Sequence, residues 1–224
     1  MKNFNLAIDG PAGAGKSTIA KKIAKQLGFI YVDTGAMYRA MALFFLRHQI
    51  DASDHNRIDD ACKHVNITIE YKAGEQIVVL NGENVNGLIR TEEVGNMASA
   101  SSVNKTVRLK LVELQQKLAQ KENVVMDGRD IGTYVLPNAD LKIYLTASTT
   151  VRARRRWAEL KVKGIEANII AIENDIFERD HRDMNRDFAP LKQAEDAVYL
   201  DSSDLTIDEV VEKIIDLYKK KIEA

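Results

Sequence analysis

A glycine-rich segment near the start of the chain, GPAGAGKS at residues 10–17, limits the possible folds more than any other feature of the sequence. It matches the pattern G-x-x-x-x-G-K-[S/T]. An apolar stretch at residues 4–8 precedes it, and residues 19–27 have apolar side chains spaced for one face of a helix. Glycines let backbone N–H groups turn inward around a phosphate, and the start of a helix adds partial positive charge. The strand, loop and helix together predict a phosphate-binding loop.

The loop also carries side chains with a defined chemistry toward a nucleotide. Lys16 is placed to reach the β and γ phosphates, and the Ser17 hydroxyl is placed to coordinate Mg²⁺ bound with ATP. Asp127 closes a later apolar strand, where a carboxylate could hold a metal-bound water. The predicted ATP-binding residues of the loop and the following helix are Gly10, Pro11, Ala12, Gly13, Ala14, Gly15, Lys16, Ser17 and Thr18.

Strand and helix patterns alternate along most of the chain, which predicts a parallel sheet with helices on both faces. Gly28 is expected to end the first helix, Ser148 to begin a later one, and Thr206 to start the last helix with a capping box. The expected fold class is α/β, a three-layer phosphate-loop NTPase core with a five-stranded parallel sheet. The expected core strands are residues 4–8, 29–32, 124–126, 141–145 and 198–200.

A different pattern interrupts this alternation at residues 65–87, where apolar and polar residues alternate as in antiparallel strands. The expected features of this segment are a turn at Ala73 and Gly74, a two-residue hairpin at Asn81 and Gly82, and a third strand from Val85. We therefore expect a core at residues 1–64 and 88–224 that carries a small antiparallel insertion at residues 65–87.

Composition limits the partners and the compartment. The chain has 224 residues with 32 basic and 33 acidic side chains, so it lacks the basic excess typical of proteins that bind the nucleic acid backbone. No apolar run reaches the ~18 residues of a membrane span, and Asp9 interrupts the first apolar stretch too early for a secretory signal. Its one cysteine, Cys62, cannot close an internal disulfide, which is typical of a reducing compartment. We expect a cytoplasmic monomer with small-molecule substrates and without nucleic acid or membrane partners.

A phosphate loop alone does not define a reaction. The sequence lacks the D-x-x-G and N-K-x-D segments of a GTPase and the LSGGQ-type segment of a transport ATPase. It has instead arginines with acidic neighbours in separate segments. They are Arg39, then Arg129 with Asp130, and then Arg179 and Arg186 with Asp183. Because guanidinium groups bind phosphate oxygens in bidentate fashion, three of them from separate segments predict a second phosphate site opposite the loop.

Several segments together carry a closer resemblance to a known family. Besides the glycine-rich loop they are DTGAMYR at residues 33–39, RTEEVGNMAS at 90–99, DGRDIGT at 127–133, ERDHRDMNR at 178–186 and APL at 189–191. In this order and spacing, over essentially the whole chain, they closely resemble the bacterial cytidylate kinases. The resemblance implies ATP-dependent phosphorylation of CMP and dCMP on an adenylate-kinase-like core. It also implies that the insertion belongs to a monophosphate-binding domain and that a helical lid spans about residues 150–187.

The resemblance assigns roles to individual residues. The implied acceptor-binding residues are Arg39, Arg129 and Arg186 for the phosphate, Arg179 and Asp183 for the sugar, Ser99, Arg108 and Asp130 for the base, and Thr34. Arg155 and Arg156 of the lid are expected to contact ATP. The residues expected to be catalytic are Lys16, Arg39, Asp127, Arg129 and Arg186.

The residues expected at the base also fit cytosine chemically. Cytosine presents an amino donor beside two acceptors, which Asp130 and Arg108 complement, whereas uracil would turn a carbonyl toward Asp130. Two alternatives remain open: a kinase for UMP or AMP, and a phosphate-loop regulator that binds nucleotide without turnover. A kinase must keep water from the γ-phosphate, so we expect the insertion and the lid to close over the nucleotides.

Overall fold

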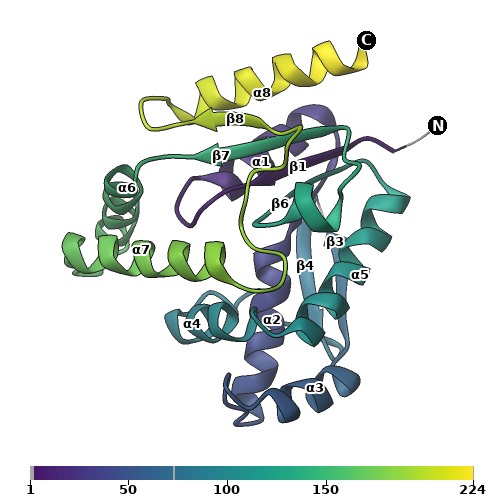
Figure 1. Ribbon diagram of the computed structural model, residues 1–224, viewed down its shortest axis with the longest axis vertical. Coiled ribbons are helices and arrows are strands. Elements are labelled where there is room, and N and C mark those ends of the chain that lie inside the picture. Colours follow the sequence, from purple (N-terminus) through teal and green to yellow (C-terminus); the bar gives the residue numbers. More distant parts are fainter. Residues whose placement is uncertain (1–2, 73, 224) are drawn as a thin grey trace.

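A parallel β-sheet forms the middle layer of the structure, a computed structural model that describes residues 3–72 and 74–223 (Figure 1). Within those residues five strands pair in the order β2-β6-β1-β7-β8, and every pairing is parallel. The strands are β1 (Asn5–Asp9), β2 (Ile30–Asp33), β6 (Val124–Gly128), β7 (Leu141–Thr146) and β8 (Val198–Asp201). The predicted parallel sheet is therefore confirmed.

Helices cover both faces of this sheet, because parallel strands are connected by crossovers that run through helices. Over the described part of the chain they are α1 (Lys16–Leu27), α2 (Thr34–Arg47), α3 (His55–His64), α4 (Glu92–Ser101), α5 (Lys105–Lys121), α6 (Thr149–Val162), α7 (Ile169–Asn185), α8 (Ile207–Ile222) and a π-helical turn η1 (Ile131–Val135). Gly28 ends α1 with a φ of 68°, Ser148 caps α6, and Thr206 begins α8 with a capping box, as predicted. Across residues 3–72 and 74–223, none of the helices combines the length and apolar character that crossing a membrane requires.

The central strands are apolar on both sides because both faces of the sheet are buried. Leu6 and Ile8 of β1 pack in the cluster that contains Ile23 of α1 and Ile214 of α8. Ala7, which lies between them, packs in the opposite cluster with residues of α2 and α5. Since all strands of this sheet run the same way, their carboxyl ends and the polar residues that follow them meet at one edge.

The insertion forms a separate antiparallel sheet, with the order β3-β4-β5 in the described residues. Its strands are β3 (Ile67–Lys72), β4 (Glu75–Leu80) and β5 (Glu83–Asn84). The hairpin is confirmed, since Asn81 and Gly82 both have positive φ, 48° and 88°. Ala73 of the predicted first turn lies outside the described residues. The expectation of a third strand from Val85 was wrong: β5 starts at Glu83 because the tight hairpin returns the chain directly onto β4.

Side chains of the antiparallel sheet bond to the backbone of β2. The side-chain oxygen of Gln76 accepts from the N–H of Asp33 at 2.8 Å, and its amide nitrogen donates to the carbonyl of Asp33 at 3.3 Å. The hydroxyl of Tyr71 donates to the carbonyl of Tyr31 at 3.1 Å. Gln76 thus takes the hydrogen-bonding place of a neighbouring strand at the β2 edge of the core sheet.

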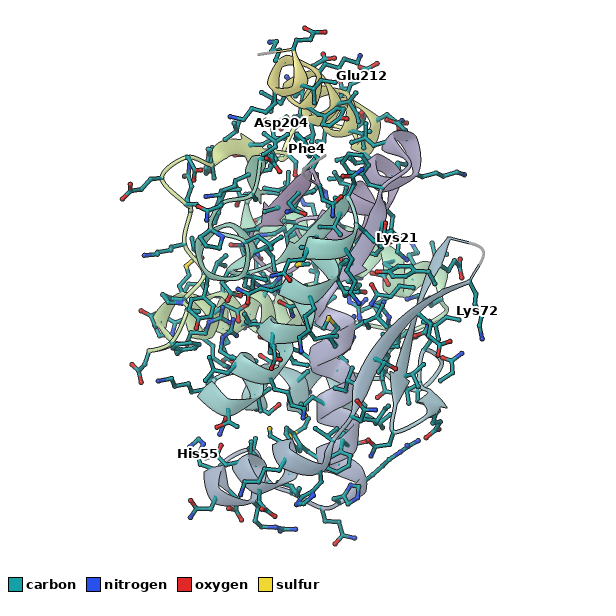
Figure 2. The ribbon with its side chains drawn as sticks, turned by 90° about the vertical axis from the view of Figure 1, so that its right-hand side faces the viewer. Phe4, Lys21, His55, Lys72, Asp204 and Glu212 are labelled. Carbon is teal, nitrogen blue, oxygen red and sulfur yellow. The ribbon has the colours of Figure 1, made fainter. Side chains whose placement is uncertain are left out.

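Helix α3, which the sequence analysis did not predict, lies at the end of the molecule furthest from α8. Figure 2 shows His55 at the start of α3 near one end of the long axis and Glu212 of α8 near the other. The buried residues of α3 are Ile58, Ala61 and Cys62, so its apolar stripe is short. Such a helix is stabilised by packing on its neighbours more than by its own sequence pattern.

A substitution at Gly10 tests how closely the loop packs against β7. A Cβ added to Gly10 would lie 1.8 Å from the carbonyl oxygen of Leu145. Gly10→Ala is expected to lower the free energy of unfolding by at least about 3 kcal/mol, because a backbone carbonyl cannot move aside cheaply. The matched change Gly95→Ala, in α4 with open space around the added Cβ, is expected to raise it by up to about 1 kcal/mol. Urea denaturation measures both values, and a loss below about 0.5 kcal/mol at Gly10 would contradict this packing.

Candidate functional site

The loop between β1 and α1 has the backbone geometry of an anion site. Gly13 and Gly15 have positive φ, 76° and 85°, and Gly15 is the N-cap residue of α1. This conformation lets successive N–H groups face one concave side, at the positive end of the helix. The ammonium of Lys16 is buried and donates to the carbonyl of Pro11 at 2.7 Å. Burial, together with the positive charge of Arg129, lowers the pKa of Lys16 to about 7.

Strand β6 brings Asp127 against the start of α1. The Ser17 hydroxyl donates to Oδ2 of Asp127 at 2.9 Å, and the Tyr31 hydroxyl donates to Oδ1 at 2.8 Å. The Thr34 hydroxyl donates to the backbone carbonyl of Asp127 at 2.6 Å. Burial and the nearby charge of Asp33 raise the pKa of Asp127, whereas the hydrogen bonds from the two side-chain hydroxyls oppose this effect.

Two carboxylates, Asp130 and Asp183, gather arginines from distant segments. Arg108 of α5 donates to Oδ2 of Asp130 at 2.5 Å, and Arg186 approaches Oδ1 of the same carboxylate at 3.3 Å. Nε of Arg129 donates to Asp183 at 2.7 Å, and Arg186 lies 3.8 Å from this second carboxylate. Although burial raises the pKa of Asp183, the positive charges of Arg129 and Arg186 hold it below its usual value. The structure thus joins these predicted residues in one network.

Asp33 forms a second cluster with Arg39 and Arg90. NH2 of Arg39 lies 3.4 Å from the carboxylate of Asp33, and NH2 of Arg90 lies 2.6 Å from it. Asp33 also caps α2 by accepting from the N–H of Ala36 at 2.8 Å. Burial raises the pKa of Asp33, but these partners hold it below the usual value. Because Asp33 is opposite Asp127 in the pairing of β2 with β6, this cluster lies beside the loop site.

Two guanidinium nitrogens in these clusters are buried without a protein acceptor. Among the residues that the structure describes, Nε of Arg39 and Nε of Arg108 have no hydrogen-bond partner. Arg108 also lies over the ring of Tyr38, 5.4 Å from its centroid, so the ring covers one face of the guanidinium. Buried donors are nearly always paired, and therefore both Nε–H groups are suited to a bound ligand.

Other predicted residues lie apart from these clusters. Arg179 approaches Asp175 within α7, Arg155 donates to the backbone after β8, and Arg156 pairs with Glu159 on α6. The arginine of α6 that reaches the loop is Arg152, whose NH1 donates to the carbonyl of Ala12 at 2.8 Å. The sequence shows a run of arginines in α6, but it does not show which of them faces the loop.

Helix α7 also contacts α4, which carries a predicted base-binding residue. The hydroxyl of Ser99 accepts from NH1 of Arg182 at 3.0 Å. The residues that sequence reasoning missed in and around the site are Tyr31, Arg90, Arg152, Asp180 and Arg182. Asp180 and Arg182 lie inside the ERDHRDMNR segment, so that motif indicated the correct segment without distinguishing all of its contacting residues.

Asp9, at the end of β1, anchors the turn that carries Asp130. Its two carboxylate oxygens accept from the N–H groups of Ile131 and Gly132, both at 2.7 Å. A Cβ added to Gly132 would lie 3.3 Å from the same carboxylate, so glycine allows this close approach. Asp9 thereby fixes the start of η1, which follows β6, and so the position of Asp130 directly before it.

Over almost its whole length the chain is similar to proteins of one family. Residues 6–220 match the family model described as cytidylate kinase. The chain is 51% identical over 222 residues to the cytidylate kinase of Caldicellulosiruptor saccharolyticus, which covers 99% of this chain and 98% of that protein. It is 50% identical over 223 residues to the cytidylate kinase of Desulfitobacterium hafniense, which covers 100% of this chain and 96% of that protein.

Two solved structures have a similar fold at low sequence identity. An uncharacterized protein from Eubacterium ventriosum matches with a TM-score of 0.55 and 14% identity, over 98% of this chain and 99% of that chain. A shikimate kinase from Bacteroides thetaiotaomicron matches with a TM-score of 0.50 and 16% identity, over 96% of this chain and 98% of that chain. At these identities the likeness concerns the arrangement of strands and helices.

The burial of Asp9 predicts a specific pH dependence of stability. Burial raises the pKa of Asp9 to about 6, although hydrogen bonds from Gly132 and Ile131 oppose this. The unfolded chain therefore loses the Asp9 proton at lower pH than the folded protein does, and stability falls as pH rises from about 4 to about 6. Relative to Asp9→Asn, the wild-type free energy of unfolding is expected to fall by about 2 kcal/mol between pH 4 and pH 7. Urea titrations of both proteins across this range measure the difference, and a difference that does not change with pH would contradict the assignment.

Proposed function

The chain belongs to the cytidylate kinase family, and from this premise we propose how its site performs the reaction. The protein phosphorylates CMP, and we propose that MgATP is the phosphoryl donor and that dCMP is also an acceptor. The observation that carries the site assignment is the group of arginines beside the loop. Arg39, Arg129 and Arg186 come from separate segments and are held by buried carboxylates close to the loop.

We assign the acceptor phosphate to these arginines. A guanidinium group has five N–H donors, so it can keep a carboxylate on one edge while it binds a phosphate with another. The buried Nε–H of Arg39, which lacks a partner in the described part of the chain, fits this second role. Thr34, whose hydroxyl holds the end of β6, lies at the same edge. The sugar is assigned to Asp183 together with Arg179.

We assign the base to the buried pair of Arg108 and Asp130, together with Ser99. The carboxylate of Asp130 would accept from the cytosine amino group, and Arg108 would donate to the neighbouring ring acceptors. Asp9 supports this arrangement by fixing the turn after Asp130. Uracil would place a carbonyl opposite Asp130, and such a repelled pair of buried acceptors costs on the order of a few kcal/mol.

Phosphoryl transfer then requires alignment and charge neutralisation more than proton transfer. The phosphate oxygen of the acceptor is itself the nucleophile, so the site needs no strong general base. Lys16 leaves the carbonyl of Pro11 for the β and γ phosphates, whose negative charge stabilises its protonated form. The positive charge of Arg129 acts on Lys16 and helps to lower its pKa, and in this assignment Arg129 binds the acceptor phosphate.

The oxygen atoms of Ser17 and Asp127 fit a Mg²⁺ ion that arrives with ATP. They lie 2.9 Å apart at the start of α1, and oxygen donors are the ligands that Mg²⁺ prefers. Within the described ranges no three His, Cys, Asp or Glu side chains group as a metal site, which agrees with an ion held partly by nucleotide phosphates. When bound, the ion offsets negative charge on the phosphates. Tyr31 orients the carboxylate of Asp127 by holding its other oxygen.

We propose that α6 and α7 form the lid and that it closes when both nucleotides are bound. Arg155 and Arg156 are held by residues away from the loop, and Arg179 points toward its own helix. A movement of this helical pair would bring them toward the nucleotides. Closure would also keep water from the γ-phosphate, which otherwise hydrolyses ATP without an acceptor.

We further propose that the protein acts in the cytoplasm as a monomer, with the two nucleotides as its partners. The assigned donor and acceptor residues all belong to this chain, so the site needs no residue from a second copy. The even balance of charges gives no general attraction to nucleic acid.

An ADP-release assay with different acceptors tests the reaction against its alternatives. CMP and dCMP are expected to stimulate ADP formation from MgATP, with kcat/KM for CMP about 10- to 1000-fold above that for UMP. A preference for UMP or AMP would contradict the base assignment. Slow hydrolysis that is independent of the acceptor, or no hydrolysis, would favour a regulator that binds nucleotide without turnover.

Arg39→Met tests the acceptor phosphate site while keeping most of the side-chain volume. Loss of the guanidinium is expected to lower kcat/KM for CMP by about 100- to 1000-fold, because one preorganised charged donor is removed. The dissociation constant of MgATP is expected to change less than about twofold. Arg57→Met, in α3 at a distance from the site, is the matched control and is expected to leave both quantities unchanged. A kcat/KM for CMP close to wild type in Arg39→Met would remove Arg39 from the site.

A further inference from the structure

A buried ion pair outside the assigned residues joins the lid helices to the phosphate loop. Arg152 of α6 and Asp180 of α7 are 4% and 8% exposed. NH1 of Arg152 lies 2.6 Å from Oδ2 of Asp180. Figure 1 shows α6 and α7 together on one flank of the molecule, beside the loop that leads from β1 into α1. Charges buried to this extent are paired and hydrogen-bonded, so their further partners show what they position.

Both side chains bond to the same residue of the loop, Ala12. Oδ1 of Asp180 accepts from the N–H of Ala12 at 3.3 Å, and NH1 of Arg152 donates to its carbonyl at 2.8 Å. The rest of the Arg152 fork is fixed as well: Nε donates to the carbonyl of Ala147 at 2.8 Å, and NH2 donates to Thr149 at 3.1 Å. Arg152 is therefore held by α6 and its preceding segment while it holds the loop.

These bonds determine the direction of two consecutive peptide units. In a trans peptide the carbonyl and the N–H of one unit point in opposite directions, and the described residues contain no cis peptide bond. The carbonyl of Ala12 shares its unit with the N–H of Gly13, which therefore points away from Arg152. The N–H of Ala12 shares its unit with the carbonyl of Pro11, which points away from Asp180 and accepts from Lys16.

The stem of Arg152 also limits the side chain that the loop can carry. A Cβ added to Gly13 would lie 3.3 Å from Cβ of Arg152 and within 4 Å of the next two carbons of the stem. The arginine therefore lies along the outer side of the loop, and the N–H of Gly13 is left on the inner side, where Lys16 also lies.

We infer that Arg152 and Asp180 are positioning residues of the donor site, which turn the loop's N–H groups toward the ATP phosphates and connect their orientation to the lid. This inference rests on the proposed function, because it takes the ATP phosphates as the occupants of the loop. A joint movement of α6 and α7 must either carry the Ala12 peptide with it or break the two hydrogen bonds that the ion pair makes to Ala12. The position of the lid helices and the binding of ATP at the loop thus affect each other, and this coupling is reciprocal. Loss of the ion pair is therefore expected to weaken ATP binding.

The test compares three variants by isothermal titration calorimetry with MgATP and, separately, with CMP. Arg152→Met keeps the stem on Gly13 but removes the donor to Ala12, and the Kd of MgATP is expected to rise about 10-fold or more. Arg152→Lys keeps the positive charge beside Asp180 but loses the guanidinium fork, so its Kd for MgATP is expected to lie between those of wild type and Arg152→Met. Arg154→Met, an exposed position on the same helix, is the matched control and is expected to leave the Kd of MgATP unchanged. The Kd of CMP is expected to change less than about twofold in all three.

A second measurement examines the pair as a unit. Asp180→Ala and Arg152→Met are expected to be non-additive, so that the double variant binds MgATP about as weakly as Arg152→Met alone. An unchanged Kd in Arg152→Met, equal losses for MgATP and CMP, or additive effects would overturn this inference while the proposed function stands. Failure of the wild-type protein to bind MgATP would overturn both.

Discussion

Carboxylates buried at the carboxyl edge of the parallel sheet impose the arrangement of the site. Asp9 and Asp33 end β1 and β2, Asp127 is the next-to-last residue of β6 between them, and each of the three is 5% exposed. Because a buried charge without partners is very unfavourable, each of them fixes the groups around it. Asp9 fixes the turn after β6, Asp33 holds Arg39 and Arg90, and Asp127 holds the hydroxyls of Ser17 and Tyr31. In the proposed site the arginines are therefore held in position by the protein itself, and such preorganisation is what makes electrostatic stabilisation effective.

The same carboxylates would compete with an incoming phosphate if each arginine offered a single donor. Arg39 shows how this conflict is avoided, since NH2 faces Asp33 while Nε has no acceptor within the described residues. Arg108 has the same division, with NH2 on Asp130 and Nε without a partner in that part of the chain. Ligand binding can then add bonds to these guanidinium groups without leaving a buried carboxylate unpaired. Lysine, a single ammonium on a flexible stem, would not allow this division.

The sequence predicted those parts of the fold that have local signals. The glycine-rich loop, the C-cap at Gly28 and the capping box at Thr206 depend on neighbouring residues, and all are present in the structure. Helix α3 and the turn η1 were missed because distant contacts stabilise them: α3 has a short apolar stripe, and Asp9 of another strand holds η1. In the site, motifs located the segments but not every contact. Which of the α6 arginines faces the loop depends on how α6 packs against α7, and the spacing of charges along one helix contains no information about that.

The last turns of α7 contact residues of both proposed substrate sites, so these residues cannot be positioned independently. Asp180 contacts the loop, Arg182 contacts Ser99 of α4, and Asp183 holds Arg129 after β6. Successive residues are about 100° apart around a helix, so positions 180 and 183 lie about 60° apart, whereas position 182 lies about 160° from 180 and contacts α4 from nearly the opposite side of α7. A rotation or translation of α7 that changes its distance to the loop must also change its contacts with Ser99 and Arg129. In the proposed assignment, α7 therefore links the geometry of the donor and acceptor sites, and the alignment of the two phosphates depends on how α7 packs.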